Sequence, residues 1–67
     1  MLKVVEVLAE SSVSWEDAAK KAVADAARTL RQVRSIYIEN MQATVEDGRI
    51  ARYRINAKIT FALESEL

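Results

Sequence analysis

One row of basic side chains in the last third of the chain has the spacing to bind an anion. Its members are Arg49, Arg52, Arg54 and Lys58. Such a row could hold a phosphate group or RNA, because each phosphate contact needs a positive charge. No aromatic row accompanies these side chains, although recognition of bases by stacking requires one. We therefore interpret the row as a strand face, solvated or between subunits, that pairs with carboxylates such as Glu39 and Glu46.

The acidic residues offer a second chemistry, the binding of a hard cation such as calcium. Glu46 and Asp47 are adjacent, and Glu39 and Asn40 lie a few residues before them. Calcium needs about six to eight oxygen ligands, and the sequence has no EF-hand spacing. Two adjacent acids usually do no more than form a turn. A calcium site assembled across subunits stays open, and the sequence does not identify its ligands.

Composition excludes several kinds of catalysis. The 67 residues contain no His and no Cys, which removes the common zinc ligands, disulfides, thiolate nucleophiles and imidazole acid–base chemistry. The single glycine, Gly48, cannot form a Gly-rich phosphate loop. Paired carboxylates for hydrolysis would need a pocket that a monomer of this size cannot enclose. We expect a protein that is not an enzyme.

Charge and hydropathy restrict the partners. Ten basic and ten acidic residues give a net charge of zero, which argues against nucleic acid as a partner. The first residues carry a carboxylate, Glu6, inside their apolar stretch, and this is not typical of a signal peptide. No run approaches the ~20 apolar residues of a membrane span. We expect a cytoplasmic protein with no membrane partner.

Hydrophobic periodicity places these residues on four elements. Valine-rich residues 2–9 predict a first strand, and 10–13 a turn. Ser14 is typical of a helix N-cap, with Glu16 and Asp17 in the first turn. A stripe with helical spacing extends over 15–33 and would face a core. Its members are Trp15, Ala18, Ala19, Ala22, Val23, Ala26, Leu30 and Val33.

Two further strands follow the helix. Residues 36–45 alternate, with Ile36 and Ile38 opposed to Tyr37 and Met41, and Asp47-Gly48 predicts a hairpin turn. Residues 49–63 alternate between an apolar face and a polar face. We predict an α+β fold in which residues 1–67 form one β-α-β-β domain. Its three-stranded sheet has the order 1-3-2, the third strand is antiparallel to both others, and the sheet wraps around the helix.

This unit is incomplete as a monomer. A strand over 49–63 would extend roughly 50 Å, whereas a compact monomer of this length is about 28 Å across. The strand must therefore bend sharply or overhang and pair with a neighbour. One helix also covers only one face of the sheet. The other face, expected to carry Ile36, Ile38, Arg52, Arg54 and Asn56, is too apolar for solvent alone. Both observations predict a multi-subunit shell.

The chain resembles the dodecin family from about Lys3 to Glu64. The resemblance rests on four segments in order: Ser14-Trp15-Glu16-Asp17-Ala18-Ala19, Arg28-Thr29-Leu30-Arg31, Val45-Glu46-Asp47-Gly48 and Phe61-Ala62-Leu63-Glu64. It implies a hollow homododecamer whose curved sheets wrap around the helices. Flavin-binding members store flavins stacked in pairs at subunit contacts, and some also bind coenzyme A. The Ser-Trp-Glu helix start is most similar to a divergent branch, the calcium dodecins, which lack the tryptophan that stacks on flavin.

The resemblance also implies a ligand site, at which this sequence departs from the family. At the position of the flavin-stacking tryptophan stands Ser35, and at that of a glutamine that bonds the flavin pyrimidine edge stands Arg54. The only tryptophan, Trp15, matches a core aromatic residue and cannot substitute. The resemblance implies that Ser35 and Arg54 face one another across a subunit contact. Tyr37 is a partial replacement for the indole in the alternative of a genuine flavin-storage protein.

We therefore expect a non-enzymatic shell that stores or sequesters a small ligand and binds flavin weakly or not at all. Arg54 is expected to pair with an acid of its own or a neighbouring subunit, or to hold an anionic ligand. On that expectation, a phosphate-bearing compound such as flavin mononucleotide (FMN) or coenzyme A is a better candidate than neutral riboflavin. A flavin-storage dodecin and a calcium-binding structural dodecin remain the alternatives.

Overall fold

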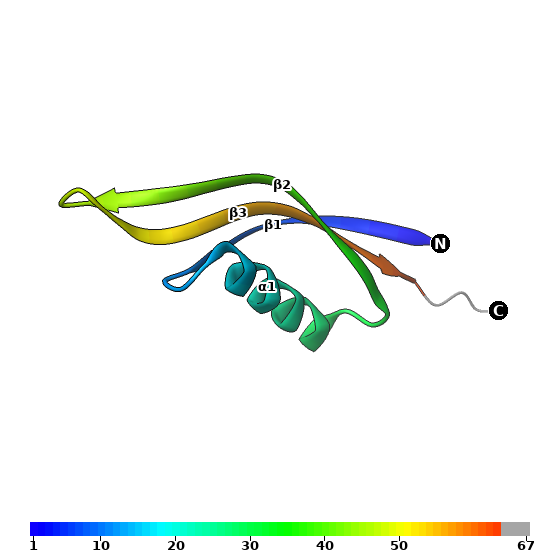
Figure 1. Ribbon diagram of the computed structural model, residues 1–67. Helices are drawn as coiled ribbons and strands as arrows, with labels where there is room; N and C mark the ends of the chain where they lie inside the picture. Colours follow the sequence, from blue (N-terminus) through cyan, green and yellow to red (C-terminus); the bar gives the residue numbers. More distant parts are fainter. Residues whose placement is uncertain (64–67) are drawn as a thin grey trace.

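A computed structural model describes residues 1–63, in which one helix packs against one face of a three-stranded sheet (Figure 1). The elements are strand β1 (Leu2–Ser11), helix α1 (Trp15–Thr29), strand β2 (Val33–Glu46) and strand β3 (Arg49–Ala62). The strand order is β1-β3-β2, and β3 is antiparallel to both neighbours. The predicted α+β fold class, the β-α-β-β unit and the 1-3-2 order are confirmed. Glu64, the predicted end of the family resemblance, lies outside the described residues.

Helix α1 begins where the sequence predicts. The Ser14 hydroxyl accepts a hydrogen bond from the Asp17 backbone N–H at 2.9 Å, which satisfies one of the free amides of the first turn. Lys20 and Lys21 form ion pairs with Glu16 and Asp17 one turn earlier, at 3.7 and 3.3 Å. The N-cap and the exposed charged face are both confirmed.

The predicted end of the helix is wrong by four residues. Helix α1 ends at Thr29, and Leu30 already has extended backbone angles. Gln32 adopts a positive φ of 55°, which turns the chain back toward the sheet. Val33 is consequently the first residue of β2, paired with Phe61 of β3, and not the last of the helical stripe. Pairing with β3 also extends β1 to Ser11, two residues beyond the predicted strand.

The core is a thin layer between α1 and β3. The helix contributes buried Ala18 and Ala22, whose small side chains let its axis approach the sheet closely. From β3 come Ile55, Ala57, Ile59 and Phe61. Val5, Val7 and Ala9 of β1 are half-buried on the same side, as their alternation predicts.

Trp15 anchors one end of this core. Its ring meets Tyr53 of β3 edge to face, with centroids 4.9 Å apart and planes at 81°. Its indole N–H donates a hydrogen bond of 2.8 Å to the Gln42 backbone carbonyl of β2. Trp15 therefore ties the start of the helix to both long strands, and the interpretation of this residue as a core anchor is confirmed.

The β2–β3 connection is a two-residue turn. Asp47 and Gly48 have φ angles of 53° and 74°, as a type I′ turn requires. This left-handed conformation is easily reached by glycine and tolerated by aspartate. The hairpin predicted from Asp47-Gly48 is confirmed.

A bulge in β2 overturns the predicted faces of that strand. Ile36 pairs with Ile59, and Ile38 pairs with Ala57. Ile59 and Ala57 are buried on the helix side, and Ile36 packs against the core. Tyr37 pairs with Lys58 on the opposite face. The register shifts between Ile38 and Asn40, so the extra residue Glu39 interrupts the alternation. Ile36 and Ile38 thus share the helix side with Met41, and the prediction that they lie on the uncovered face is wrong.

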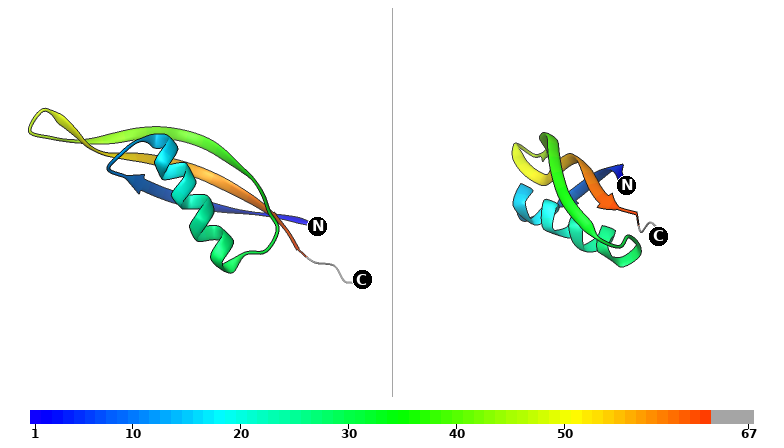
Figure 2. Two further views of the ribbon diagram at one scale, coloured as in Figure 1. Left: turned by 60° about the horizontal axis from the view of Figure 1, so that its bottom comes forward. Right: turned by 90° about the vertical axis from the view of Figure 1, so that its right-hand side faces the viewer.

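The hairpin overhangs the rest of the molecule. The chain measures 55 × 19 × 13 Å along its principal axes and has a radius of gyration of 13.9 Å. The tip of β2 and β3 extends past both β1 and α1, while the sheet curves over the helix (Figures 1 and 2). The strand of 49–62 is therefore too long for a compact monomer, as expected. The β2–β3 hairpin overhangs the helix and β1, and the sheet curves gently over the helix.

A buried serine organises the entry to the helix. The Ser11 hydroxyl, 1% exposed as a residue, donates to Asp17 Oδ2 at 2.6 Å and accepts from the Val13 amide at 2.9 Å. The hydrogen bond from Ser11, assisted by Lys21, lowers the pKa of Asp17 below its usual value. Charged Asp17 is thus favoured in the folded state.

This lowered pKa predicts an acid-sensitive contribution to stability. Because the folded pKa lies below the unfolded one, the stabilisation is fully present above the unfolded pKa and is lost as pH falls through the folded pKa. We expect Asp17→Asn to be less stable than the unmodified protein at pH 7 and to lose less stability on acidification to pH 3. Urea unfolding at fixed protein concentration measures both effects.

Glu16→Gln is the matched control for that experiment. It removes one negative charge from the same helical turn, but among residues 1–63 the ion-pair partner of Glu16 is the exposed Lys20 alone. Its acid sensitivity should remain that of the unmodified protein. Equal acid sensitivity of Asp17→Asn and Glu16→Gln would refute the role assigned to the contact between Ser11 and Asp17.

Candidate functional site

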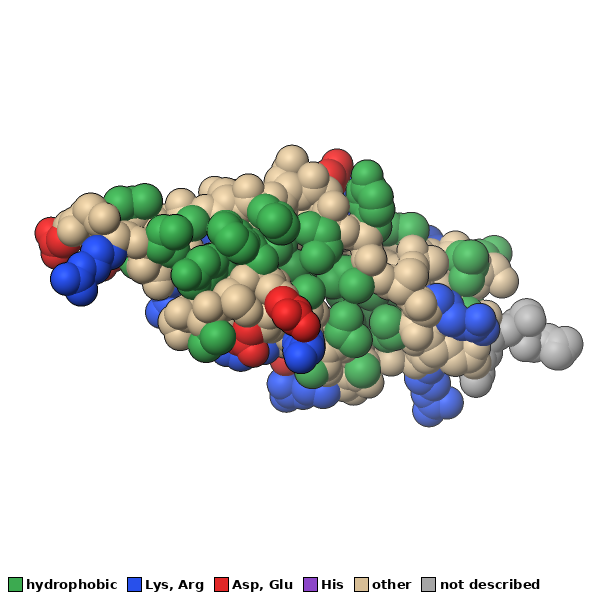
Figure 3. Space-filling view, viewed as in Figure 1, with side chains coloured by type: hydrophobic (Ala, Val, Ile, Leu, Met, Phe, Trp, Pro, Cys, Tyr) green, Lys and Arg blue, Asp and Glu red, His purple; other side chains and the backbone are tan. Residues whose placement is uncertain are grey.

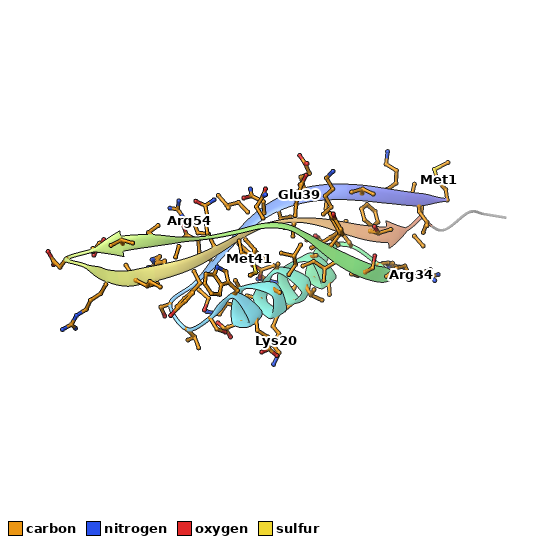
Figure 4. The ribbon with its side chains drawn as sticks, turned by 45° about the horizontal axis from the view of Figure 1, so that its top comes forward. Met1, Lys20, Arg34, Glu39, Met41 and Arg54 are labelled. Carbon is orange, nitrogen blue, oxygen red and sulfur yellow. The ribbon has the colours of Figure 1, made fainter. Side chains whose placement is uncertain are left out.

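The candidate ligand residues lie on the outer face of the sheet, the face turned away from α1. Cross-strand pairing forms this face as a ladder, because directly paired residues project to the same side. Ser35 pairs with Thr60, Tyr37 with Lys58, and Arg54 with Gln42. In Figure 4, Arg54 and Glu39 extend from the sheet on this side, away from the helix. One chain thus presents all three predicted site residues on one surface.

One chain does not bring Ser35 and Arg54 together. Their positions along β3 differ by six residues, the separation of Thr60 from Arg54, which corresponds to roughly 20 Å. Tyr37 lies one step from Ser35 on the ladder, and its side chain is largely exposed. Within one chain, a single compact ligand group therefore cannot touch both Ser35 and Arg54.

Arg54 has a carboxylate partner in its own chain. Its Nε donates to Glu10 Oε2 at 2.5 Å, and the second oxygen of Glu10 lies 3.8 Å from Arg52 Nη1. Glu10 stands directly opposite Arg54 in the pairing of β1 with β3. Sequence reasoning did not identify Glu10, because residues 10–13 were predicted as a turn. The signal that could have found it is the continuation of β1 in register with Arg54.

Lys58 is also charge-paired. Its ammonium group lies 4.0 Å from a Glu6 oxygen and 3.9 Å from a Glu39 oxygen. Glu6 is the register partner of Lys58, and Glu39 is the bulged residue of β2. The interpretation of the basic row as a strand face paired with carboxylates is confirmed at Lys58, Arg54 and Arg52. At the hairpin tip, Arg49 is the register partner of Glu46.

A polar pocket opens beside the arginines. It has a volume of about 490 Å³ and is lined by Glu10, Thr44, Glu46, Ala51, Arg52 and Arg54. Two arginines and two glutamates leave its lining without net charge. Residues 1–63 contain no group of three or more acidic side chains placed to hold a metal ion. No helix formed by these residues has both the length and the apolar character that crossing a membrane requires.

A single helix on one face of a three-stranded sheet, with a charged face opposite, defines a small β-α-β-β protein with an open sheet. The family model described as Dodecin matches residues 1–64, and the chain belongs to the dodecin family. No curated protein sequence matches it.

Solved structures agree with this assignment. The dodecin from Streptomyces coelicolor is 29% identical, with a TM-score of 0.93 over 98% of this chain and 94% of that one. A variant of the Thermus thermophilus dodecin is 26% identical, with a TM-score of 0.92 over 97% of each chain. The calcium dodecin from Mycobacterium tuberculosis, described as calcium-chelating with a novel calcium-binding site, is 28% identical. Its TM-score is 0.83 over 100% of this chain and 96% of that one.

Proposed function

We propose that the chain assembles into a hollow dodecin-type homododecamer. The observation that carries this proposal is the uncovered apolar surface of the overhanging hairpin. Met41, Val45 and Ile50 are 58%, 64% and 51% exposed, and hydrophobic side chains form a band between the tip and the helix (Figure 3). Soluble monomers rarely leave such a surface contiguous and open. In a homo-oligomer with closed symmetry, a second copy of the chain would cover this surface.

The thin core supports the same assembly. The isolated chain buries few large side chains, and it has neither disulfide nor histidine ligands to compensate. Chains of this length usually need a disulfide, a bound metal ion or oligomerisation to be stable. A groove of about 590 Å³ between β1 and α1, lined mainly by Val5, Val7, Ala9, Ala22, Ala26 and Leu30, offers a further apolar surface for a neighbouring subunit.

Light scattering tests the assembly. We expect a mass near twelve times the 7.5 kDa of one chain. Val45→Asp places a charge on the apolar hairpin surface and should shift the mass toward smaller species at micromolar concentration. Ser12→Asp adds the same charge to an exposed loop and should leave the mass unchanged. A stable monomer or dimer of the unmodified protein would contradict the proposal.

We further propose that this shell stores or sequesters a small ligand, is not an enzyme and binds flavin weakly. Ser35 offers no aromatic face for an isoalloxazine ring. Stacking of a ring on an aromatic side chain contributes ~1–3 kcal/mol, so its loss lowers affinity roughly ten- to a hundred-fold. Tyr37 lies on the same outer face, one step away on the ladder, and can replace the missing contact only in part. A cytoplasmic location stays a prediction.

Restoring the aromatic side chain tests the role of position 35. We expect Ser35→Trp to gain riboflavin affinity by roughly ten- to a hundred-fold, measured by quenching of flavin fluorescence. Ser35→Leu is the matched control, since it adds apolar volume without a π system, and it should gain little. Strong quenching by the unmodified protein, or a yellow preparation, would favour a genuine flavin-storage or coenzyme A-binding dodecin instead.

A calcium-binding structural role is the second candidate. The similarity to the M. tuberculosis calcium dodecin favours it. Within one chain, Glu6 and Glu39 are engaged by Lys58, so a calcium site would need oxygen ligands from more than one subunit. A rise in melting temperature with calcium that magnesium does not reproduce would support this role.

A further inference from the structure

The pair of arginines on the outer face is already occupied by a carboxylate. Glu10 offers one oxygen to Arg54 Nε at 2.5 Å and the other to Arg52 Nη1 at 3.8 Å. The side chains of Glu10 and Arg54 are each about one-third exposed, at 33% and 36%. The contact therefore lies at the surface that a ligand would reach.

This placement follows from the register and not from chance contact of long side chains. Glu10 and Arg54 are directly paired across β1 and β3, and Arg52 is the next residue of β3 on the same face. Within residues 1–63, the bond to Glu10 is the only hydrogen bond that the Arg54 side chain makes. A carboxylate presents two anionic oxygens to a guanidinium group, as a phosphate does. Glu10 thus has the charge and shape of an anionic ligand group.

We propose that Glu10 is a specificity-determining residue, an internal counter-ion that makes this face select uncharged ligands over ligands bearing phosphate or carboxylate. An incoming anion would have to displace Glu10 from Arg54 or approach it at short range, where like charges repel. Glu10 is tethered to the same sheet, so it competes at a high effective concentration. Glu46, the second carboxylate of the pocket lining, opposes an anion as well.

This inference rests on the proposed ligand face and deepens it by naming the class of ligand. It reverses the preference expected from the sequence, in which Arg54 favoured FMN or coenzyme A over riboflavin. The sequence left two outcomes open for Arg54, an acid partner or an anionic ligand, and the preference for phosphate-bearing compounds followed from the second; the pairing with Glu10 is the first. The structure places the neutralising group within its own chain.

Inorganic phosphate is the probe, because its binding requires neither an aromatic contact nor a flavin. Melting temperatures are measured against phosphate concentration, with potassium chloride holding the ionic strength constant. The unmodified protein should show only the general salting-out stabilisation by phosphate, which rises without saturation. Glu10→Gln keeps the size of the side chain, removes the negative charge that neutralises both guanidinium groups and should bind phosphate at least about tenfold more tightly. Adding Arg54→Gln to this variant should abolish the gain.

Glu6→Gln is the matched control. Glu6 lies on the same strand and the same face, and its removal changes the net charge equally, but its partner is Lys58 and not the arginine pair. It should behave as the unmodified protein does. Equal phosphate gains in Glu6→Gln and Glu10→Gln, or no gain in Glu10→Gln, would overturn the inference.

The unmodified protein provides a test that needs no variant. Saturable stabilisation of this protein by phosphate, beyond the general salting-out effect, would show that Glu10 does not exclude anions and would overturn the proposal, even if Glu10→Gln failed to fold. The mass of the assembly, measured separately by light scattering, distinguishes failure of the proposed assembly from failure of this inference.

Discussion

Helix α1 is too short to cover the strands that it packs against. Its 15 residues extend about 22 Å, whereas the 14 residues of β3 extend about 46 Å. The consequence is an elongated chain whose hairpin tip carries apolar side chains beyond the reach of any helix in residues 1–63. The outer face of the sheet is open for a different reason, because the one helix in residues 1–63 packs on the opposite face. The exposed hairpin surface and the open outer face therefore have separate geometric origins.

The alanine content of α1 adds to this constraint. Ala18 and Ala22 allow close approach to β3, but they bury little area themselves. The strands consequently supply most of the apolar volume, through Ile55, Ile59 and Phe61. Lengthening such an alanine-rich helix would bury little additional apolar area. Part of the apolar surface that remains exposed is on the hairpin, at Met41, Val45 and Ile50.

Local signals in the sequence predicted most of the fold. Alternation along most of 49–63, the N-cap at Ser14 and the Asp47-Gly48 turn each depend on neighbouring residues only, and all three are confirmed, although a register shift beside Ala51 interrupts the alternation and β3 ends at Ala62. The faces of β2 were predicted wrongly because a bulge depends on pairing with β3. No periodicity within 36–45 reveals that Glu39 is the extra residue. The end of α1 was predicted wrongly for a related reason. Val33 has the spacing of the helical stripe, and only its pairing with Phe61 shows that it belongs to β2.

The candidate site shows the same division between local and long-range information. Ser35, Tyr37 and Arg54 were predicted by position, and their common face follows from the register with β3. Glu10 was missed because its importance comes from a contact 44 residues away in sequence. The register shows that the outer face contains two charged clusters. In one, Glu10 pairs with Arg52 and Arg54. In the other, Lys58 pairs with Glu6 and Glu39. These three basic and three acidic side chains leave the two clusters together without net charge. A count of charges along the sequence cannot distinguish an arginine that is available to a ligand from one that is already paired.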